Sequence, residues 1–196
     1  MIRDFLGIDP GLNGAFAVVS GDRVRYKMVM PTISFTTKDG KIKTELDREG
    51  ILSFLTLFPK HVHVVIEKQE AFRGQDITSS CTICKNYGIL LMALSVAHTF
   101  ITEEPSKVWQ AHFGIVSAKE GKGTTKEQAF HIAHRLYPNA DFRRSERSHI
   151  VHDGIVDAVL IANYCQSLFT PAQVMPVPLV TKLPELLKVE WGASRS

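Results

Sequence analysis

The stretch that most constrains the fold is residues 2–20, IRDFLGIDPGLNGAFAVVS, in which two apolar runs flank one acid and a glycine-containing turn. The pattern predicts two antiparallel strands, one up to Ile8 and one from Ala15, with Asp9 at the mouth of the hairpin. An unpaired buried carboxylate is costly, so a bound cation is one interpretation of Asp9. The other is a turn cap, in which Asp9 accepts hydrogen bonds from the amides that follow it.

A second acid follows the next buried strand. Residues 62–66 contain a short apolar run typical of a strand that is buried on both faces, and Glu67 stands at its carboxyl end. If this strand is the neighbour of the first, their carboxyl ends lie about 5 Å apart, so Asp9 and Glu67 can share an ion. The alternative is a surface glutamate at the end of a strand.

The last helix carries two more acids. It begins near Asp153 and is almost wholly apolar after Gly154, so Asp157 is the one charge within a buried face. Four residues turn about 400° on an α-helix, so both carboxylates point the same way. Asp153 could instead serve only as an N-cap, but that role does not explain Asp157.

The rest of the chain alternates between strands and helices. A third strand is predicted over residues 23–30, and a polar loop or extended hairpin over 32–44. Helices are predicted over residues 46–58, 80–97, 105–113 and 125–137, and a short strand over 99–102. The 196 residues, 44% of them hydrophobic, suit one domain over residues 1–170 with a proline-containing tail over 171–196. No apolar stretch approaches the roughly 18 residues of a membrane span.

The four acids favour a metal site built from oxygen ligands. Carboxylates suit Mg²⁺ or Mn²⁺ and not zinc, and a cluster of them cannot all stay ionised without cations. Two ions about 4 Å apart would activate a water and stabilise the leaving oxygen in phosphodiester hydrolysis. The net charge of +3 permits an anionic partner, although it falls short of a strongly basic nucleic-acid protein.

Several motifs together resemble the RuvC-like branch of the RNase H-like nucleases, the Holliday-junction resolvases. The matching segments follow the family's order between residues 6 and 165: GIDPGLNG, VVIEKQEAF, PSKVWQ, the basic linker before KEQAFHIAHRLYP, and HDGIVDAVLIANY. The last three are most similar to the plant chloroplast resolvase and to phage-borne relatives. The order and spacing of several motifs make this resemblance more specific than any one motif.

The resemblance implies an α/β fold, namely an RNase H-like mixed five-stranded sheet whose first three strands are antiparallel, flanked by helices. It also implies a homodimer, each subunit of which nicks one strand of a four-way DNA junction and leaves a 5′-phosphate. The catalytic metal ligands would be Asp9, Glu67, Asp153 and Asp157, with two Mg²⁺ ions per site and Mn²⁺ able to substitute. We expect such a protein in the cytoplasm of a bacterium or phage-infected cell and not at a membrane. An organelle stays open, although no transit peptide is visible.

The resemblance further implies a set of DNA contacts. Phe72 falls where the bacterial enzymes place an aromatic residue that wedges into the junction centre; the alternative is that it packs under its loop. Basic residues of the PSKVWQ motif, of the linker and of the FRRSERSH segment are expected to bind phosphates. They are Lys107, Lys119, Lys122, Lys126, Arg143, Arg144 and Arg147.

One departure from the family concerns the third acid. The bacterial enzymes usually space their last two ligands three residues apart, whereas position 154 is glycine here and the acid is Asp153. Relative to Asp157, Asp153 lies about 40° around the helix and His152 about 140°. Asp153 is therefore the expected ligand, and a carboxylate also suits Mg²⁺ better than imidazole does. If the helix begins only after Asp153, His152 becomes a candidate again.

Other functions fit the sequence less well. An RNase H-like nuclease or a recombinase catalytic domain shares the acids but lacks junction preference. A phosphotransferase of the actin and sugar-kinase type also begins with a strand, an acid-containing turn and a second strand, but it needs two such lobes and a much longer chain. A junction-binding protein without cleavage would not need the intact acid set.

Overall fold

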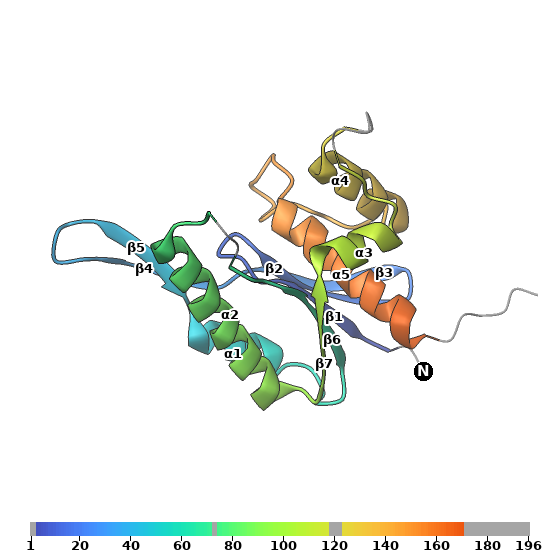
Figure 1. The fold of residues 1–196 in the computed structure, drawn as a ribbon. Helices are drawn as coiled ribbons and strands as arrows, with labels where there is room; N and C mark the ends of the chain where they lie inside the picture. Colours follow the sequence, from blue (N-terminus) through green and yellow to red (C-terminus); the bar gives the residue numbers. More distant parts are fainter. Residues whose placement is uncertain (1–2, 72–73, 118–122, 171–196) are drawn as a thin grey trace, which may run out of the picture.

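The computed structural model describes residues 3–71, 74–117 and 123–170. Its centre is a five-stranded sheet in the order β3-β2-β1-β6-β7, with helices packed on both faces (Figure 1). The predicted tail, as well as Phe72, Lys119 and Lys122, lies outside the described residues.

The central sheet is mixed. Its strands are β1 (Phe5–Asp9), β2 (Ala15–Ser20), β3 (Arg23–Val29), β6 (His63–Lys68) and β7 (Phe100–Pro105). The strands β1, β2 and β3 are antiparallel neighbours, whereas β6 runs parallel to β1 and β7 runs parallel to β6. This arrangement confirms the predicted fold class.

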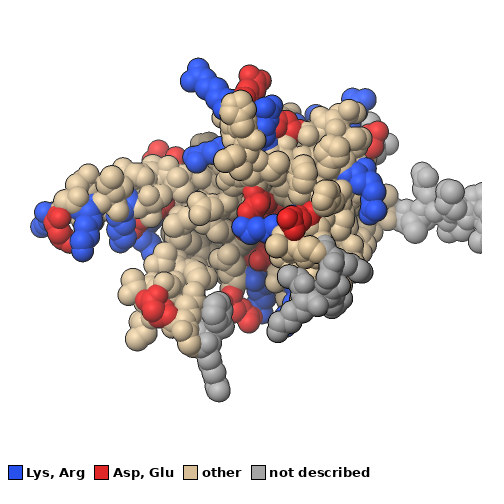
Figure 2. All heavy atoms as spheres, turned by 90° about the horizontal axis from the view of Figure 1, so that it is seen from above, with Lys and Arg blue, Asp and Glu red and all other residues tan. Residues whose placement is uncertain are grey.

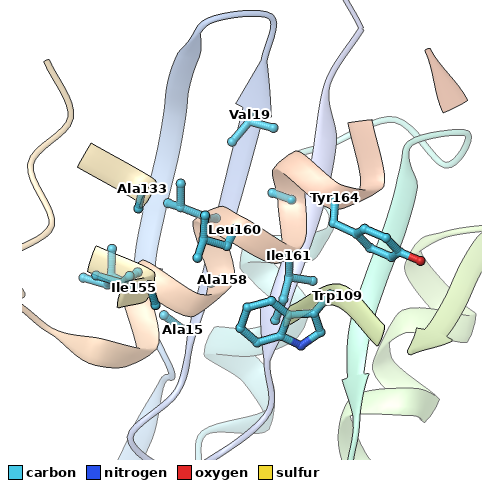
Figure 3. Packing of buried hydrophobic residues seen from close by; sticks show 14 of the residues in the cluster. Ala15, Val19, Trp109, Ala133, Ile155, Ala158, Leu160, Ile161 and Tyr164 are labelled. Carbon is cyan, nitrogen blue, oxygen red and sulfur yellow. The ribbon is translucent and has the colours of Figure 1, made fainter. Parts of the chain in front are cut away.

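Two cores lie on opposite faces of this sheet. One face is covered by α1 (Arg48–Leu55) and α2 (Ile77–Ala97), and the other by α3 (Ser106–His112), α4 (Thr125–Leu136) and α5 (Asp153–Phe169) (Figure 1). Side chains alternate between faces along a strand, so Phe16 and Val18 pack under α1 and α2, while Ala15 and Val19 pack under α5. Figure 3 shows Ala15 and Val19 beside the α5 residues Ile155 and Leu160.

A glycine lets α5 cross β1 at very short range. A Cβ added to Gly7 would stand 2.2 Å from the backbone N of Ala162 and 2.3 Å from the backbone O of Ala158. These atoms are main chain and cannot rotate away, so only glycine fits. The close crossing brings the start of α5 to the carboxyl end of β1, where Asp9 lies.

A separate hairpin projects from this body. The strands β4 (Thr32–Thr36) and β5 (Ile42–Leu46) pair only with each other among the described residues and form an arm (Figure 1). Of the two alternatives for residues 32–44, the extended hairpin is confirmed. The predicted helix over 46–58 is corrected at both ends, because Leu46 ends β5 and α1 closes at Leu55. The Asp47 side chain sets the new start by accepting a hydrogen bond from the Gly50 amide at 3.1 Å.

The helix α2 is longer than the sequence predicted. The Asp76 carboxylate accepts hydrogen bonds from the amides of Thr78 and Ser79, and this cap starts the helix at Ile77 instead of residue 80. By length and composition alone α2 could cross a membrane, contrary to the expectation that no apolar stretch is long enough. In this fold one side of α2 packs onto the sheet through Leu90 and Leu94.

Candidate active site

Two neighbouring strands bring the first two acids together. The parallel register pairs Ile8 with Ile66, so Asp9 and Glu67 are the next residues on adjacent strands. This confirms the prediction that the two strands are neighbours. Both acids lie at the carboxyl ends of these two parallel strands, so the distance between the strands fixes the distance between the acids.

The first turn of α5 supplies the other two acids. The helix begins at Asp153, and Asp157 follows one turn later. Both line a cleft of about 520 Å³ together with Asp9. The rest of the lining comes from the β1–β2 turn, the segment after β6, α2, α4 and α5: Pro10, Gly11, Leu12, Asn13, Gly14, Gln69, Thr82, Ile83, Asn86, Lys126 and Gly154. Figure 2, seen from above, shows acidic side chains beside a basic one in the middle of this face.

Burial makes three of the acids hard to ionise, and repulsion by neighbouring acids adds to this at Glu67 and Asp157. Burial raises the pKa of Asp9 to about 6, although the Gly11 amide opposes the shift. Burial and the charge of Asp9 raise the pKa of Glu67 to about 7. Burial, followed by the charges of Asp9, Glu67 and Asp153, raises the pKa of Asp157 to about 8. Ionising these acids together would therefore place uncompensated negative charge in and beside the cleft, which a bound cation would offset.

Glu67 is oriented from the core. Its Oε2 accepts a hydrogen bond of 2.9 Å from the indole Nε1 of Trp109, a side chain that is only 1% exposed. Glu67 does not itself line the cleft, but its charge acts on Asp157 inside it. The Trp109 hydrogen bond lowers the pKa of Glu67 and so favours the ionised carboxylate.

A lysine already brings positive charge to the cleft. The Lys126 Nζ contacts Asp153 Oδ2 at 2.5 Å, and both side chains are more than half exposed. Lys126, which was predicted as a DNA contact, lies in the first turn of α4 and lines the cleft with its side chain largely exposed to solvent. Its ammonium also lowers the pKa of Asp157 slightly, against the larger effects of burial and of the other acids.

The residues suit a hard divalent cation by their chemistry. All four candidate ligands are carboxylates, and burial raises the pKa of Asp9, Glu67 and Asp157, so a bound cation would favour their ionised forms. As the side chains stand, no three or more Asp, Glu, His or Cys residues in the described part of the chain are grouped closely enough to hold one ion. Asp153 is paired with Lys126 instead, so Asp153 can bind an ion through this oxygen only after the pair separates.

The unusual spacing of the last two acids has a steric cause. A Cβ added to Gly154 would stand 2.5 Å from the carbonyl oxygen of Asn13, so no acid fits at that position. His152 is the N-cap of α5, and its Nδ1 accepts the Ile155 amide at 3.3 Å. Its ring lines a different cleft from that of Asp153. The helix thus begins at Asp153. The prediction that Asp153 and Asp157 share one helical face depended on this start.

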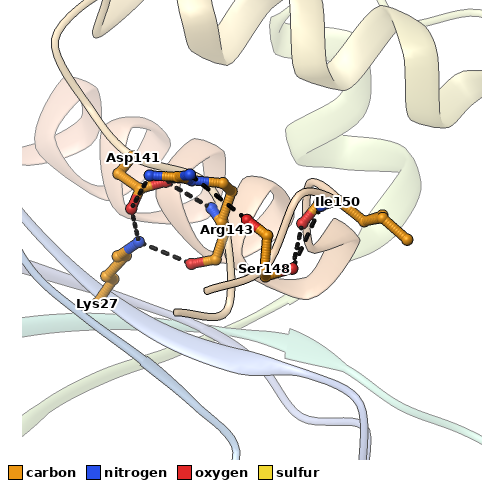
Figure 4. A network of polar contacts seen from close by, with 5 residues as sticks. All are labelled: Lys27, Asp141, Arg143, Ser148 and Ile150. Atoms are coloured by element: carbon orange, nitrogen blue, oxygen red, sulfur yellow. Dashed lines mark hydrogen bonds and ion pairs between the residues drawn. The ribbon is translucent and has the colours of Figure 1, made fainter. Parts of the chain in front are cut away.

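The predicted phosphate ligands lie in different surroundings. Lys107 and Arg147 are exposed, on α3 and on the segment before α5. Arg143 is partly exposed but already forms hydrogen bonds within the protein: its guanidinium donates to Asp141 at 2.9 Å, and its carbonyl accepts from Lys27 at 2.7 Å (Figure 4). The predicted contacts of all these residues with DNA stay predictions.

No protein-family model matches the sequence, and no curated protein matches it either. Among solved structures, the chain is similar to that of Thermus thermophilus RuvC, with a TM-score of 0.50 and 17% identity over 86% of this chain and 96% of that one. The chain has a RuvC-like fold.

Two further solved structures match with lower TM-scores. They are T. thermophilus RuvC in complex with a Holliday junction substrate (0.45, 16% identity, 82% of this chain and 90% of that one) and the yeast mitochondrial Holliday junction resolvase Ydc2 (0.38, 13% identity, 83% of each chain).

Sequence reasoning missed three residues of the site in this RuvC-like fold. Trp109 was quoted only as part of a motif, without a role. Thr82 and Asn86 reach the cleft from α2. Neither had a distinct signal in the sequence, because several other polar residues lie in the same half of α2 and only the fold shows that Asn86 is buried.

Proposed function

We propose that this protein is a metal-dependent endonuclease that resolves four-way DNA junctions by paired, symmetric nicks. The observation that carries the proposal is that acids from β1, β6 and α5 meet at one end of the sheet of a RuvC-like fold. The order of the sequence motifs supports the preference for junctions. Hydrolysis of a phosphodiester suits such a site, because hard cations bind both carboxylates and phosphate oxygens.

Each acid has a role in this proposal. Asp9, Glu67, Asp153 and Asp157 would hold two Mg²⁺ ions, with Mn²⁺ able to substitute. When bound, the metal supplies a Lewis acid that activates water and stabilises the leaving oxygen. Trp109 keeps Glu67 in position through its indole hydrogen bond. Lys126, once released from Asp153, offers its ammonium to a DNA phosphate.

Paired nicks require two copies of the site, and α2 offers a surface for a second copy. Its outer side exposes Met92 and Val96, which are 67% and 58% exposed. These residues and Leu52 of α1 line an apolar groove of about 520 Å³. We infer that this face pairs with its own counterpart, since a two-fold axis brings identical patches together.

The decisive experiment compares the cleavage of a synthetic four-way junction with that of duplex, flap and RNA–DNA hybrid substrates, with and without Mg²⁺. We expect strand cleavage only with the metal and fastest on the junction. Asp9→Asn should reduce cleavage by more than about 100-fold, the size that losses at metal sites reach, while junction binding persists. Equal cleavage of all substrates would favour an RNase H-like nuclease or recombinase domain. Binding without cleavage would contradict the proposal.

A further inference from the structure

The β4–β5 hairpin projects from the body and is almost wholly exposed. Every residue of β4 is exposed, and its five residues extend about 17 Å at roughly 3.4 Å per residue. The tip is closed by main-chain hydrogen bonds from Thr37 to Lys41 (2.8 Å) and from Gly40 to Thr37 (2.9 Å). The arm adds little to either core, since only Leu46 at its base is buried.

The two faces of this arm differ in chemistry. The register pairs Ser34 with Thr44 and Phe35 with Lys43, so the hydroxyl groups share one face, with Ile42 toward the tip and Leu46 at the base, and the other face carries Phe35 and Lys43. The Ser34 and Thr44 hydroxyl oxygens are 3.0 Å apart. One hydroxyl hydrogen serves that contact, which leaves the other to donate elsewhere.

The hydroxyl face borders a polar cleft that continues from the acid cleft. This second cleft has a volume of about 240 Å³, and Thr32, Ser34 and Thr44 form one wall of it. Arg144 and His152 stand among the residues of the other wall, and the described lining contains no carboxylate. The two clefts share the residues of the β1–β2 turn: Leu12, Asn13 and Gly14.

The tip of the arm carries positive charge that is free to bind an anion. Lys38 and Lys41 are exposed, and neither forms an ion pair with an acid in the described part of the chain. Asp39 lies between them, so the tip keeps a net positive charge. At the base, by contrast, Lys43 pairs with Glu45 at 3.4 Å. Figure 2 shows basic side chains along the arm, at the left of the view.

We propose that the arm and Arg144 form a phosphate-binding track, which continues the acid cleft and holds the backbone of the cleaved DNA strand beyond the cut. This inference rests on the proposed nuclease function. Hydroxyl and guanidinium groups donate to phosphate oxygens, and a lining without carboxylates does not repel them. Such contacts position the strand without reading its sequence, and the lysines at the tip reach phosphates farther along the same duplex.

The test measures junction binding by fluorescence anisotropy, with Ca²⁺ in place of Mg²⁺ and over a series of salt concentrations. Lys38→Gln/Lys41→Gln should reduce the salt slope of binding by about 1 to 2 units, because each lost phosphate contact removes about 0.9. Ser34→Ala/Arg144→Gln should weaken binding by about tenfold without changing the cleavage sequence. The matched control is Arg23→Gln/Lys60→Gln, two exposed residues near the opposite end of the sheet, which should bind like the wild type.

Methylphosphonate substitutions in the DNA locate the track. Replacing single phosphates beside the cut should weaken binding by the wild type at one or two positions, and the Arg144 variant should lose that sensitivity. Unchanged salt slopes in folded arm variants, with cleavage by the wild type intact, would overturn the track alone. Failure of the wild type to cut any DNA would instead overturn the proposed nuclease function on which the track depends.

Discussion

At the scale of single residues, Trp109 links the core to the chemistry of the site. The substitution Trp109→Phe keeps the aromatic bulk and removes the hydrogen bond to Glu67. A hydrogen bond to a charged group contributes about 1.5–3 kcal/mol, so we expect single-turnover junction cleavage to fall by about 10- to 100-fold and the required Mg²⁺ concentration to rise.

The matched control for Trp109 is Tyr137→Phe. It removes the hydrogen bond that Asn163 donates to the Tyr137 hydroxyl at 2.7 Å, away from the acids. This variant should lose stability but cleave like the wild type once folded. Equal cleavage rates for both variants would show that Trp109 does not position Glu67.

A second residue makes stability depend on pH. His98 is 3% exposed, and among the described residues its Nε2 has no hydrogen-bond partner. Burial lowers its pKa from 6.5, so the unfolded chain takes up a proton more readily than the folded one. Burying the neutral His98 ring therefore costs no stability above pH 6.5. As the pH falls below 6.5, the unfolded chain binds a proton that the folded chain does not, and the free energy of unfolding decreases.

The variant His98→Gln tests this dependence. In urea unfolding, the wild type should lose stability below neutral pH more steeply than the variant, by up to about 1.4 kcal/mol per pH unit. The comparison cancels the titration of the acids in the cleft, which both proteins share. Parallel curves would show that His98 is protonated equally in the folded and unfolded states.

At the scale of elements, the site depends on how closely α5 approaches β1. Gly7→Ala forces a methyl group against the backbone of α5, and overpacking of this kind typically costs about 1–3 kcal/mol. Because Asp9 and Asp157 sit on the two elements that separate, cleavage should fall further than thermal stability alone explains. Ser53→Ala, at an exposed position of α1 that lines neither the acid cleft nor the α2 groove, is the control and should raise the melting temperature slightly.

The close approach of α5 to β1 could not be predicted from the sequence, although the elements themselves could. The hairpin around Asp9, the buried strand before Glu67 and the helix from Asp153 follow from local patterns, and the structure places them as predicted. Contacts between distant segments leave no such pattern. The bond from Trp109 to Glu67, 42 residues apart in the chain, is therefore visible only in the fold. The starts of α1 and α2 were misplaced because the N-caps Asp47 and Asp76 determine where these helices begin, whereas the prediction relied on the spacing of apolar residues.

At the scale of the whole molecule, the proposed function requires two copies that cut together. We expect the wild type to be a dimer, and Met92→Glu to be a monomer, because it buries a charge in the inferred interface. Light scattering after size exclusion measures this change. Leu168→Glu, at a position on α5 that is 46% exposed and outside both the α2 groove and the acid cleft, is the matched control and should remain dimeric.

The same pair of variants tests whether the two nicks are coupled. On a supercoiled plasmid that extrudes a cruciform, a dimer that cuts both strands in one encounter yields linear DNA, whereas a lone subunit yields nicked circles. Met92→Glu should shift the product from linear to nicked while its acid cleft stays intact, since Met92 does not line that cleft. If the monomeric variant still yields linear DNA at the wild-type rate, each subunit makes both cuts and symmetric pairing through α2 is wrong.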